Sequence, residues 1–394
     1  MPNAILALNA GSSSIKFALF EIKSSKALSL VSRGALEGIG TKPHFVARDA
    51  QGATLGEQSW PAGAAATHEM LLGGLLKWVE QHLGQDSLVA VGHRVVHGGR
   101  EFTAPVVLTG DILQKLEQLT PLAPLHQPHS LAPVEALNTL RPGLPQIACF
   151  DTAFHRTMLP VATRFALPRA FEEEGVRRYG FHGLSYEYIA RRLRETAPHL
   201  ASEHVIVAHL GNGASLCAME DGRSVDTSMG FSTLDGLVMG TRCGAIDAGV
   251  VLYMLQEKSL AAQEVADILY NRSGLLGVSG VSSDMRALLE SDDQHARDAI
   301  ELFVFRAARE VAALAGSLGG VDAIVFTAGI GEHAPPVRAR ICERLGWLGV
   351  VLDPEANDAN ADCISAADSP VEVRVIPTDE EYMIALHVVE TMKK

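Results

Sequence analysis

Two apolar segments in different halves of the chain each run into a glycine-containing turn and continue as a second apolar segment. The first is Ile5 to Phe20, ILALNAGSSSIKFALF, and the second is Val205 to Met219, VIVAHLGNGASLCAM. A third segment, Asp322 to Pro335, repeats the first half of the pattern as DAIVFTAGIGEHAP. Glycine permits positive φ and lets backbone N–H groups approach a ligand that a Cβ would displace. The repeat predicts two related domains with strand, loop and strand arrangements suited to phosphate.

An ordinary β-hairpin explains any one of these turns better than a ligand site does. None of them matches the Walker pattern or a dinucleotide-binding fingerprint. Together, however, they resemble the duplicated nucleotide clamp of actin, hexokinase and Hsp70. This resemblance implies an α/β, ribonuclease H-like fold of two domains with the active site in the cleft between them. We expect an N-terminal domain of residues 1–150, joined by a C-terminal helix at 382–394, and a nucleotide-binding domain of residues 151–381.

The composition excludes several other classes of protein. A chain of 394 residues is long for one hydrophobic core, which agrees with two domains. Its 33 Lys and Arg against 46 Asp and Glu give a net charge of −13, which argues against nucleic acid or an anionic membrane surface as partner. The N-terminus has no secretory signal pattern, and no apolar run has the length of a membrane span. Five cysteines without C-x-x-C spacing favour a reducing compartment, so we expect a cytoplasmic protein.

Two arginines lie in apolar, glycine-bounded surroundings. Arg94 belongs to the predicted strand SLVAVGHRVV, and Arg242 belongs to the glycine-rich stretch from Val225 to Gly249. An arginine in such a place is costly unless it meets an anion, and its planar fork suits carboxylate or phosphate. His93 and His97 have the spacing of a metal pair, but the helical H-E-x-x-H context is missing, so we favour a structural role for them.

Other candidate groups follow predicted strands or lie in loops. Asp151 comes directly after the strand QIACF, where it serves either catalysis or the capping of a turn. His182 lies in the glycine-rich segment RRYGFHGLSY. His126 is predicted to lie in a proline-bounded loop, either as a ligand contact or merely solvated. Asn9 and the acidic triplet that begins at Asp379 are candidate Mg²⁺ ligands, although such a triplet also suits the first turn of any helix.

Apolar periodicity predicts the main helices. They span residues 67–83, 109–119, 297–318 and 337–345. Polar loops are predicted at residues 121–130 and 277–286.

Nine motifs, in this order and spread over almost the whole chain, carry a specific resemblance. They are NAGSSSIKF, HRVVHGG, FDTAFH, RRYGFHG, HLGNG, DTSMGF, MGTRCG, FTAGIGE and IPTDEE. The set resembles the acetate and butyrate kinase, or acetokinase, family. The resemblance implies a homodimer that forms acetyl phosphate and ADP reversibly from acetate and ATP, with Mg²⁺, or Mn²⁺ as an alternative.

The resemblance also implies roles for residues at matching positions. Arg94 resembles the arginine that binds the substrate carboxylate, and Asp151 resembles the active-site acid. His182 and Arg242 resemble the stabilisers of the transition state. His126 lies where the family has a further histidine that contacts phosphate.

The metal, nucleotide and acyl sites are assigned by the same resemblance. Asn9 and Glu380 resemble the magnesium-linked residues, with Glu381 as the alternative to Glu380, and Lys16 resembles a cation on the nucleotide side. The ATP-binding runs correspond to His209, Leu210, Gly211, Asn212 and Gly213, to Asp284, Met285 and Arg286, and to Gly329, Ile330, Gly331, Glu332 and His333. The small acyl pocket corresponds to Val96, Leu125, Phe181 and Thr233, where Thr233 replaces a proline common in the family.

Chemistry constrains one of these roles. Ionised acetate has no proton to lose, so Asp151 need not act as a base, and we expect it to orient Arg94 or metal-bound water. Direct in-line transfer is the preferred mechanism. The rivals are a propionate or butyrate kinase of the same family and, from a different class, a conformational switch that uses ATP without any acceptor. The latter has no need of Arg94, His182 and Arg242.

Overall fold

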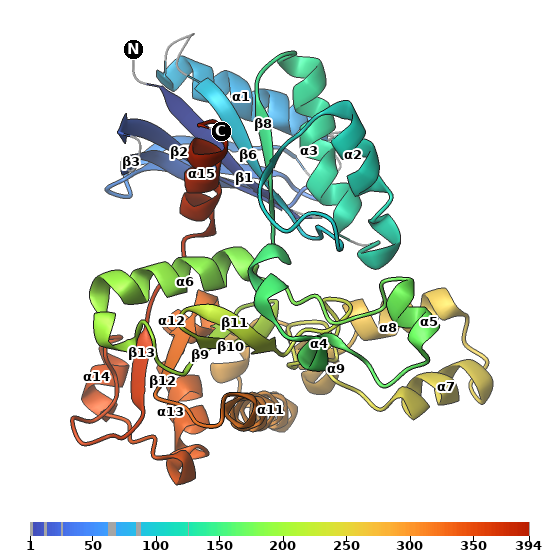
Figure 1. The fold of residues 1–394 in the computed structure, drawn as a ribbon, viewed down its shortest axis with the longest axis vertical. Helices are drawn as coiled ribbons and strands as arrows, with labels where there is room; N and C mark the ends of the chain where they lie inside the picture. Colours follow the sequence, from blue (N-terminus) through green and yellow to red (C-terminus); the bar gives the residue numbers. More distant parts are fainter. Residues whose placement is uncertain are drawn as a thin grey trace. The chain divides into compact units, whose positions relative to one another are not determined.

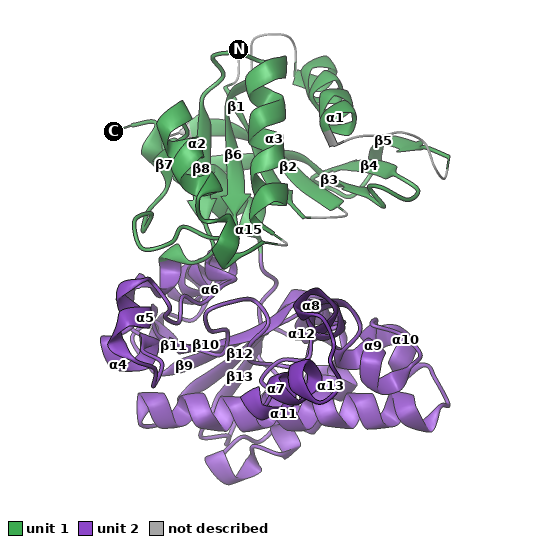
Figure 2. Ribbon diagram, turned by 90° about the vertical axis from the view of Figure 1, so that its right-hand side faces the viewer, with its two compact units in different colours: residues 1–153, 379–394 green, residues 154–378 purple. Residues whose placement is uncertain are grey.

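The computed structural model describes residues 3–11, 14–24, 27–61, 68–83, 88–124 and 126–393. The chain divides into two compact units (Figures 1 and 2). Unit 1 contains residues 1–153 and 379–394, and unit 2 contains residues 154–378. These borders lie three residues from the expected ones, so Asp151 and Glu380 belong to unit 1. The backbone N–H of Asp151 donates to Val95 O at 3.1 Å, which extends the pairing of unit 1 strands to this residue.

Among the described residues, unit 1 forms one sheet of eight strands in the order β5-β4-β3-β2-β1-β6-β8-β7. The strands are β1 (Ala4–Ala10), β2 (Ser14–Ser24), β3 (Ala27–Glu37), β4 (His44–Asp49), β5 (Thr54–Ser59), β6 (Leu88–Val95), β7 (Val106–Val107) and β8 (Gln146–Phe150). The helices are α1 (His68–Leu83), α2 (Gly110–Glu117), α3 (Gln127–Leu140) and α15 (Glu380–Thr391). β1 and β2 are antiparallel, whereas β1, β6 and β8 are parallel neighbours.

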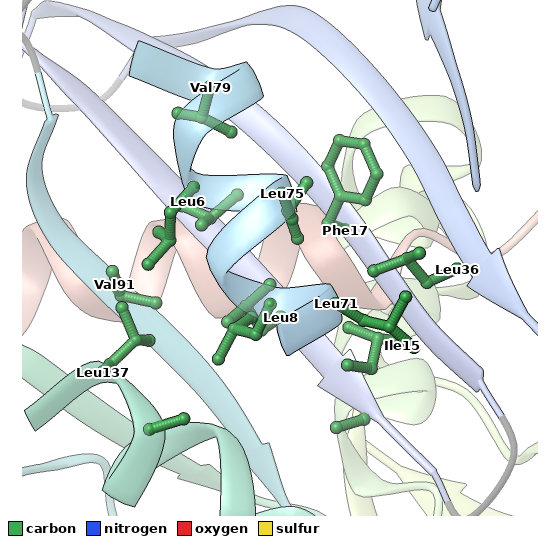
Figure 3. Packing of buried hydrophobic residues seen from close by; sticks show 14 of the residues in the cluster. Leu6, Leu8, Ile15, Phe17, Leu36, Leu71, Leu75, Val79, Val91 and Leu137 are labelled. Atoms are coloured by element: carbon green, nitrogen blue, oxygen red, sulfur yellow. The ribbon is translucent and has the colours of Figure 1, made fainter. Parts of the chain in front are cut away.

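The main core of unit 1 lies between the sheet and helices α1 and α3 (Figure 3). Leu6 and Leu8 are two positions apart on β1, so both point to the face that carries this core, where they meet Leu75 of α1 and Leu137 of α3. Helix α15 packs against β1 and β6. A Cβ at Gly92 of β6 would lie 2.4 Å from a methyl carbon of Ile384, so this strand requires glycine for α15 to approach.

All residues of unit 2 are described, and they form one sheet of five strands in the order β11-β10-β9-β12-β13. The strands are β9 (Val205–Leu210), β10 (Ala214–Glu220), β11 (Arg223–Thr227), β12 (Ala323–Thr327) and β13 (Glu372–Val375). The helices are α4 (Pro160–Thr163), α5 (Arg169–Glu173), α6 (Gly183–Thr196), α7 (Ala248–Gln256), α8 (Ala262–Asn271), α9 (Gly274–Ser279), α10 (Met285–Leu289), α11 (Gln294–Leu318), α12 (Ala328–His333), α13 (Pro335–Glu343) and α14 (Pro354–Asp358). Ile189 and Leu193 of α6 pack on Val207 of β9, while α11 packs on β10 and β11.

Both units contain the same strand order. In unit 1 the order is β3-β2-β1-β6-β8, and in unit 2 it is β11-β10-β9-β12-β13. In each case an antiparallel hairpin is followed by two parallel strands. The prediction of a duplicated ribonuclease H-like fold is therefore confirmed. Unit 1 adds β4, β5 and β7 at the edges of its sheet, and none of these was predicted.

Two local predictions need correction. Residues 121–130 are not a single loop, because α3 begins at Gln127 with a proline in its first turn, where the missing N–H costs no helical bond. Residues 277–286 contain the end of α9 and the start of α10 rather than one loop. The third glycine segment leads from a strand into a helix, as expected, and its glycines already belong to the short helix α12, which begins immediately after β12. Within the described ranges, no helix combines the length and apolarity of a membrane span.

Candidate active site

In unit 1, Arg94 of β6 lies beside Asp151 at the end of β8. Arg94 Nε donates to both carboxylate oxygens at 3.1 Å, and Nη2 donates to Oδ2 at 2.5 Å. Asp151 is fully buried and Arg94 is partly buried. Burial by itself would lower the pKa of Arg94, but the charge and hydrogen bonds of Asp151 raise it above its usual value. Arg94 is thus a fixed cation held in one orientation by its neighbour.

Acidic groups gather around the same pair. Asn9, at the end of β1, donates from Nδ2 to Glu380 at 2.8 Å and to Glu381 at 3.5 Å. Burial raises the pKa of Glu380 to about 7, and the charge of Asp151 adds to this effect while Arg94 opposes it. Of the two carboxylates, Glu380 lies nearer to Asn9. Because its burial and its negative neighbours raise its pKa, a further positive charge is favourable at this place.

The residues present fit Mg²⁺, which prefers one or two carboxylates together with waters and phosphate oxygens. In unit 1, Glu380 carries a carboxylate and Asn9 an amide oxygen, and the two side chains are neighbours, since Asn9 Nδ2 donates to Glu380 at 2.8 Å. In the described part of the chain, no three His, Cys, Asp or Glu side chains form a complete metal cage.

The remaining predicted residues of unit 1 are distributed as follows. Lys16 of β2 pairs with Asn9 across the hairpin and is exposed. Val96 is fully buried just after β6. His126 is partly buried and immediately precedes α3, so it starts a helix rather than lying in the middle of a loop. Leu125 lies outside the described residues.

In unit 2, the loop between β9 and β10 brings a histidine and an arginine together. The backbone N–H of Gly211 donates to Gly213 O at 3.1 Å, which closes a tight turn. A Cβ at Gly213 would lie 3.3 Å from Arg242 Nη2 and 3.4 Å from His182 Nε2. Arg242 is held by the carbonyl oxygen of Thr233, to which Nη1 donates at 2.8 Å. Both side chains therefore converge on one glycine.

The three predicted ATP-binding runs meet around one cavity of unit 2, of about 320 Å³. Its lining contains Gly211, Asn212, Ser283, Asp284, Met285, Arg286, Leu289, Gly329, Ile330, His333 and Ala334. Glu332 points elsewhere, since its Oε1 accepts hydrogen bonds from the backbone N–H groups of Ala328 and Thr378. Glu332 thus fixes the start of α12 rather than lining the cavity.

His182 and His209 are the stacked pair beside this loop. Their ring centroids are 4.1 Å apart at an interplanar angle of 18°. His182 precedes α6 with a left-handed backbone, φ 57°, which is unusual for a residue with a Cβ. His209 Nδ1 lies 2.9 Å from Ser185 Oγ, which in turn donates to Thr378 Oγ1 at 2.9 Å.

His155 supports the turn that carries His182. Its Nε2 lies 2.9 Å from the carbonyl oxygen of Phe181, and its Nδ1 lies 2.8 Å from Ser224 Oγ. Burial lowers the pKa of His155 to about 4, so it is neutral at ordinary pH. Because Nε2 faces a carbonyl, this nitrogen carries the proton. Phe181 and Thr233, the predicted acyl-pocket residues of unit 2, are both buried.

Sequence reasoning missed several residues of this region. Ser283 and Ala334 line the cavity directly next to predicted positions, and Leu289 lines it from three residues after Arg286 on α10, so nearness to the predicted runs was the available signal. Ser215, which forms a hydrogen bond with His182, and Tyr186, whose hydroxyl forms one with Ser215, were not singled out. No periodicity distinguishes them from other buried residues of a helix and a strand.

The repeated sheet order, with glycine turns, two histidines and an arginine beside a cavity in unit 2, defines a phosphotransferase with the duplicated fold of actin and hexokinase. Residues 4–386 match the model of the Acetokinase family, and the chain belongs to this family. It is 55% identical to an acetate kinase of Rhodopseudomonas palustris, with 98% of each chain covered, and 52% identical to one of Methylocella silvestris, with 98% of this chain and 97% of the relative covered.

Solved structures agree with the family. A propionate kinase from Francisella tularensis is 37% identical and superposes with a TM-score of 0.90 over 98% of both chains. The acetate kinase of Porphyromonas gingivalis is 35% identical, with a TM-score of 0.87 over 99% of this chain and all of that one. The motif resemblance seen in the sequence is thereby confirmed.

Proposed function

We propose that this chain transfers the γ-phosphoryl group of ATP reversibly to acetate, giving acetyl phosphate and ADP. The observation that carries the proposal is the Arg94–Asp151 pair, because a protein that only hydrolyses ATP has no use for a partly buried, oriented cation that can bind a carboxylate. Membership of the Acetokinase family and the close acetate kinase relatives support the same reaction.

Arg94 binds acetate in this proposal, and Asp151 holds the arginine. Asp151 engages Nε and Nη2, so we assign the remaining nitrogen, Nη1, to the carboxylate of acetate. Acetate arrives ionised and needs no base, which leaves Asp151 with an orienting role.

Replacing Asp151 by Asn tests this role. We expect the KM for acetate to rise strongly and the pH profile of kcat to keep its shape. Loss of one limb of that profile would instead make Asp151 a proton carrier.

Arg242 and His182 act on the phosphoryl group. Two anions that react with each other repel, so the equatorial oxygens of the transferring group need fixed positive charge and hydrogen-bond donors. The two nitrogens that approach Gly213 are of this kind. We assign direct in-line transfer, with the nucleotide held in the cavity that is lined by Gly211 and Asn212 and by residues of the runs at 284–286 and 329–333.

Mg²⁺, or Mn²⁺ in its place, is the metal we propose, held by Asn9 and Glu380 together with water and phosphate oxygens. When bound, the metal neutralises charge on the phosphates and orients them. The clustering of Glu380 with Asp151 and Glu381 supports a cation here, since each negative charge raises the pKa of Glu380. Isothermal titration with MgADP should show weaker binding for Glu380→Gln, and Glu381→Gln should change it less.

A homodimer is the assembly we propose, in the cytoplasm. The support is α7, which has no buried residue although it carries Val250, Leu252, Tyr253 and Leu255, all at least 36% exposed. An apolar helix with no buried face is typical of a protein interface. Sedimentation of the wild type should give a dimer, and Leu252→Glu should shift it to monomer. A wild type that sediments as a monomer would refute the assignment.

Hydroxylamine trapping with ATP, Mg²⁺ and formate, acetate, propionate or butyrate tests the function directly. We expect acetyl hydroxamate to dominate. Discrimination against one methylene is only about 1–3 kcal/mol, so propionate should react more slowly rather than not at all. A maximum at propionate or butyrate would assign a sister activity, for which Thr233 at the acyl pocket is the first residue to test. ATP hydrolysis without any hydroxamate would refute the kinase.

A further inference from the structure

Two buried hydroxyl groups lie behind His182. Ser215 Oγ, on β10, is 2.8 Å from His182 Nδ1, and the hydroxyl of Tyr186, one turn along α6, forms a hydrogen bond with the same Oγ. Both Tyr186 and Ser215 are 0% exposed. Ser215 therefore stands between a phenol and an imidazole in a chain of hydrogen bonds.

The chemistry of the three groups sets the direction of this chain. Ser215 has one hydroxyl proton to donate and two neighbours. A phenol is a stronger donor than an aliphatic hydroxyl, and a neutral imidazole nitrogen is a stronger acceptor than a phenol oxygen. The favoured order is therefore Tyr186 to Ser215 to His182 Nδ1, and donors aligned in one direction reinforce one another. Neutral His182 must then carry its proton on Nε2.

The tautomer matters because of where Nε2 lies. Nε2 of His182 and Nη2 of Arg242 approach the same point at Gly213. His182 also faces the stacked ring of His209 and lies at the N-terminal end of α6. Arg242 and the helix end already supply positive charge or potential, which favours an uncharged donor over a second cation. With Nε2–H the ring donates to a phosphoryl oxygen, whereas with Nδ1–H it would present a lone pair to an anion.

We propose that Tyr186 and Ser215 are positioning residues that hold neutral His182 as the Nε2–H tautomer and so make it a hydrogen-bond donor to the transferring phosphoryl group. This inference rests on the proposed function for its catalytic consequence. The tautomer itself is a property of unit 2 and does not depend on turnover.

The test is Tyr186→Phe, which removes one hydroxyl and keeps the buried ring. In full-length protein labelled with ¹⁵N-histidine, wild-type His182 should show a protonated Nε2, and the variant should shift protonation toward Nδ1, because Ser215 is then free to accept from that nitrogen. kcat should fall about 10- to 100-fold, as for other partners that orient a ligand from behind, with little change in the KM for ATP or acetate. Tyr188→Phe, on the same helix, is the matched control and should leave both measurements unchanged.

Ser215→Ala gives a second, independent readout. If Tyr186 acts only through Ser215, the double variant should lose no more activity than Ser215→Ala alone. Additive losses, or an unchanged tautomer in Tyr186→Phe, would overturn the inference. A wild type that forms no acetyl hydroxamate would refute the proposed function, while the nitrogen spectra would still decide the tautomer.

Discussion

The β1–β2 loop of unit 1 and the β9–β10 loop of unit 2 occupy the same place in the same strand order, yet different ionisable groups lie beside them. Beside the first loop, Asn9 contacts Glu380 and Glu381. Beside the second, His182 and Arg242 converge on Gly213. The two units therefore share a strand order, but the side chains beside the equivalent loops differ.

This difference shows which part of a repeated fold carries specificity. In each unit an antiparallel pair of strands lies next to a parallel strand, and most of the ionisable groups come from segments outside that pair. In unit 1 these are the end of β8 and the start of α15. In unit 2 they are the segment before α6 and the glycine-rich stretch at 228–247. Unit 1 therefore suits a cation and a small carboxylate, and unit 2 suits phosphate.

The largest expected difference between the two units is in their stability at low pH. Burial lowers the pKa of His93 and His97 in unit 1, and of His155 in unit 2, to about 4 in each case. Because the unfolded chain binds these protons near pH 6.5, the free energy of unfolding should fall as the pH drops from about 6.5 through 4, by about 3 kcal/mol for each histidine. Hydrogen exchange read by peptide, corrected for intrinsic rates, should show unit 1 losing protection first. Equal loss in both units would contradict the comparison.

Substitution of Arg94 and of Arg242 should affect different steps of catalysis, because the two arginines belong to different units. Arg242→Ala should lower kcat about 10²- to 10³-fold with modest changes in KM, since it removes a charge that acts on the transition state. Arg94→Ala should raise the KM for acetate as well as lower kcat. Steady-state kinetics with each substrate varied in turn measures both. Weaker substrate binding with intact turnover in Arg242→Ala would reject its assigned role.

The glycines of the two loops should differ in their tolerance of alanine. In Gly213→Ala the new Cβ would meet His182 and Arg242 at 3.3 to 3.4 Å, whereas in Gly11→Ala the nearest atom among the described residues is Ser14 O at 3.6 Å, an ordinary contact. We expect about a 10-fold loss of kcat for Gly213→Ala, because displaced catalytic groups are costly, and little change for Gly11→Ala. Equal losses of kcat in the two variants would mean that both loops contribute equally to catalysis, which would contradict the comparison.

A smaller difference concerns two helix caps. Asp284 accepts from Ala287 N at 3.0 Å at the start of α10, and Thr109 accepts from Ile112 N at 3.4 Å at the start of α2. Replacing either by Ala should cost about 1 kcal/mol of stability, measured by urea unfolding. Only Asp284→Ala should also raise the KM for ATP, since Asp284 lines the cavity of unit 2. An unchanged KM would leave Asp284 as a cap and nothing more.

Much of the fold was predictable from local patterns. The apolar stripe of residues 297–318 gave α11, and the glycine turns gave the duplication. Strands β3 to β5 were missed because they are polar on one face and lie toward the sheet edge, where alternation is weak. Helix α3 was missed because prolines read as loop signals although one lies in its first turn.

The sequence by itself determined the family, the two halves and the residue types that the reaction requires, because ordered motifs and periodicity are properties of short segments. Only the tertiary structure decided which residues meet: Asp151 with Arg94, Glu380 with Asn9 across 371 positions, and Ser215 with His182. The reason is physical. Such partners are brought together by strand pairing and helix packing between distant segments, and a hydrogen bond between them leaves no periodic trace in either segment.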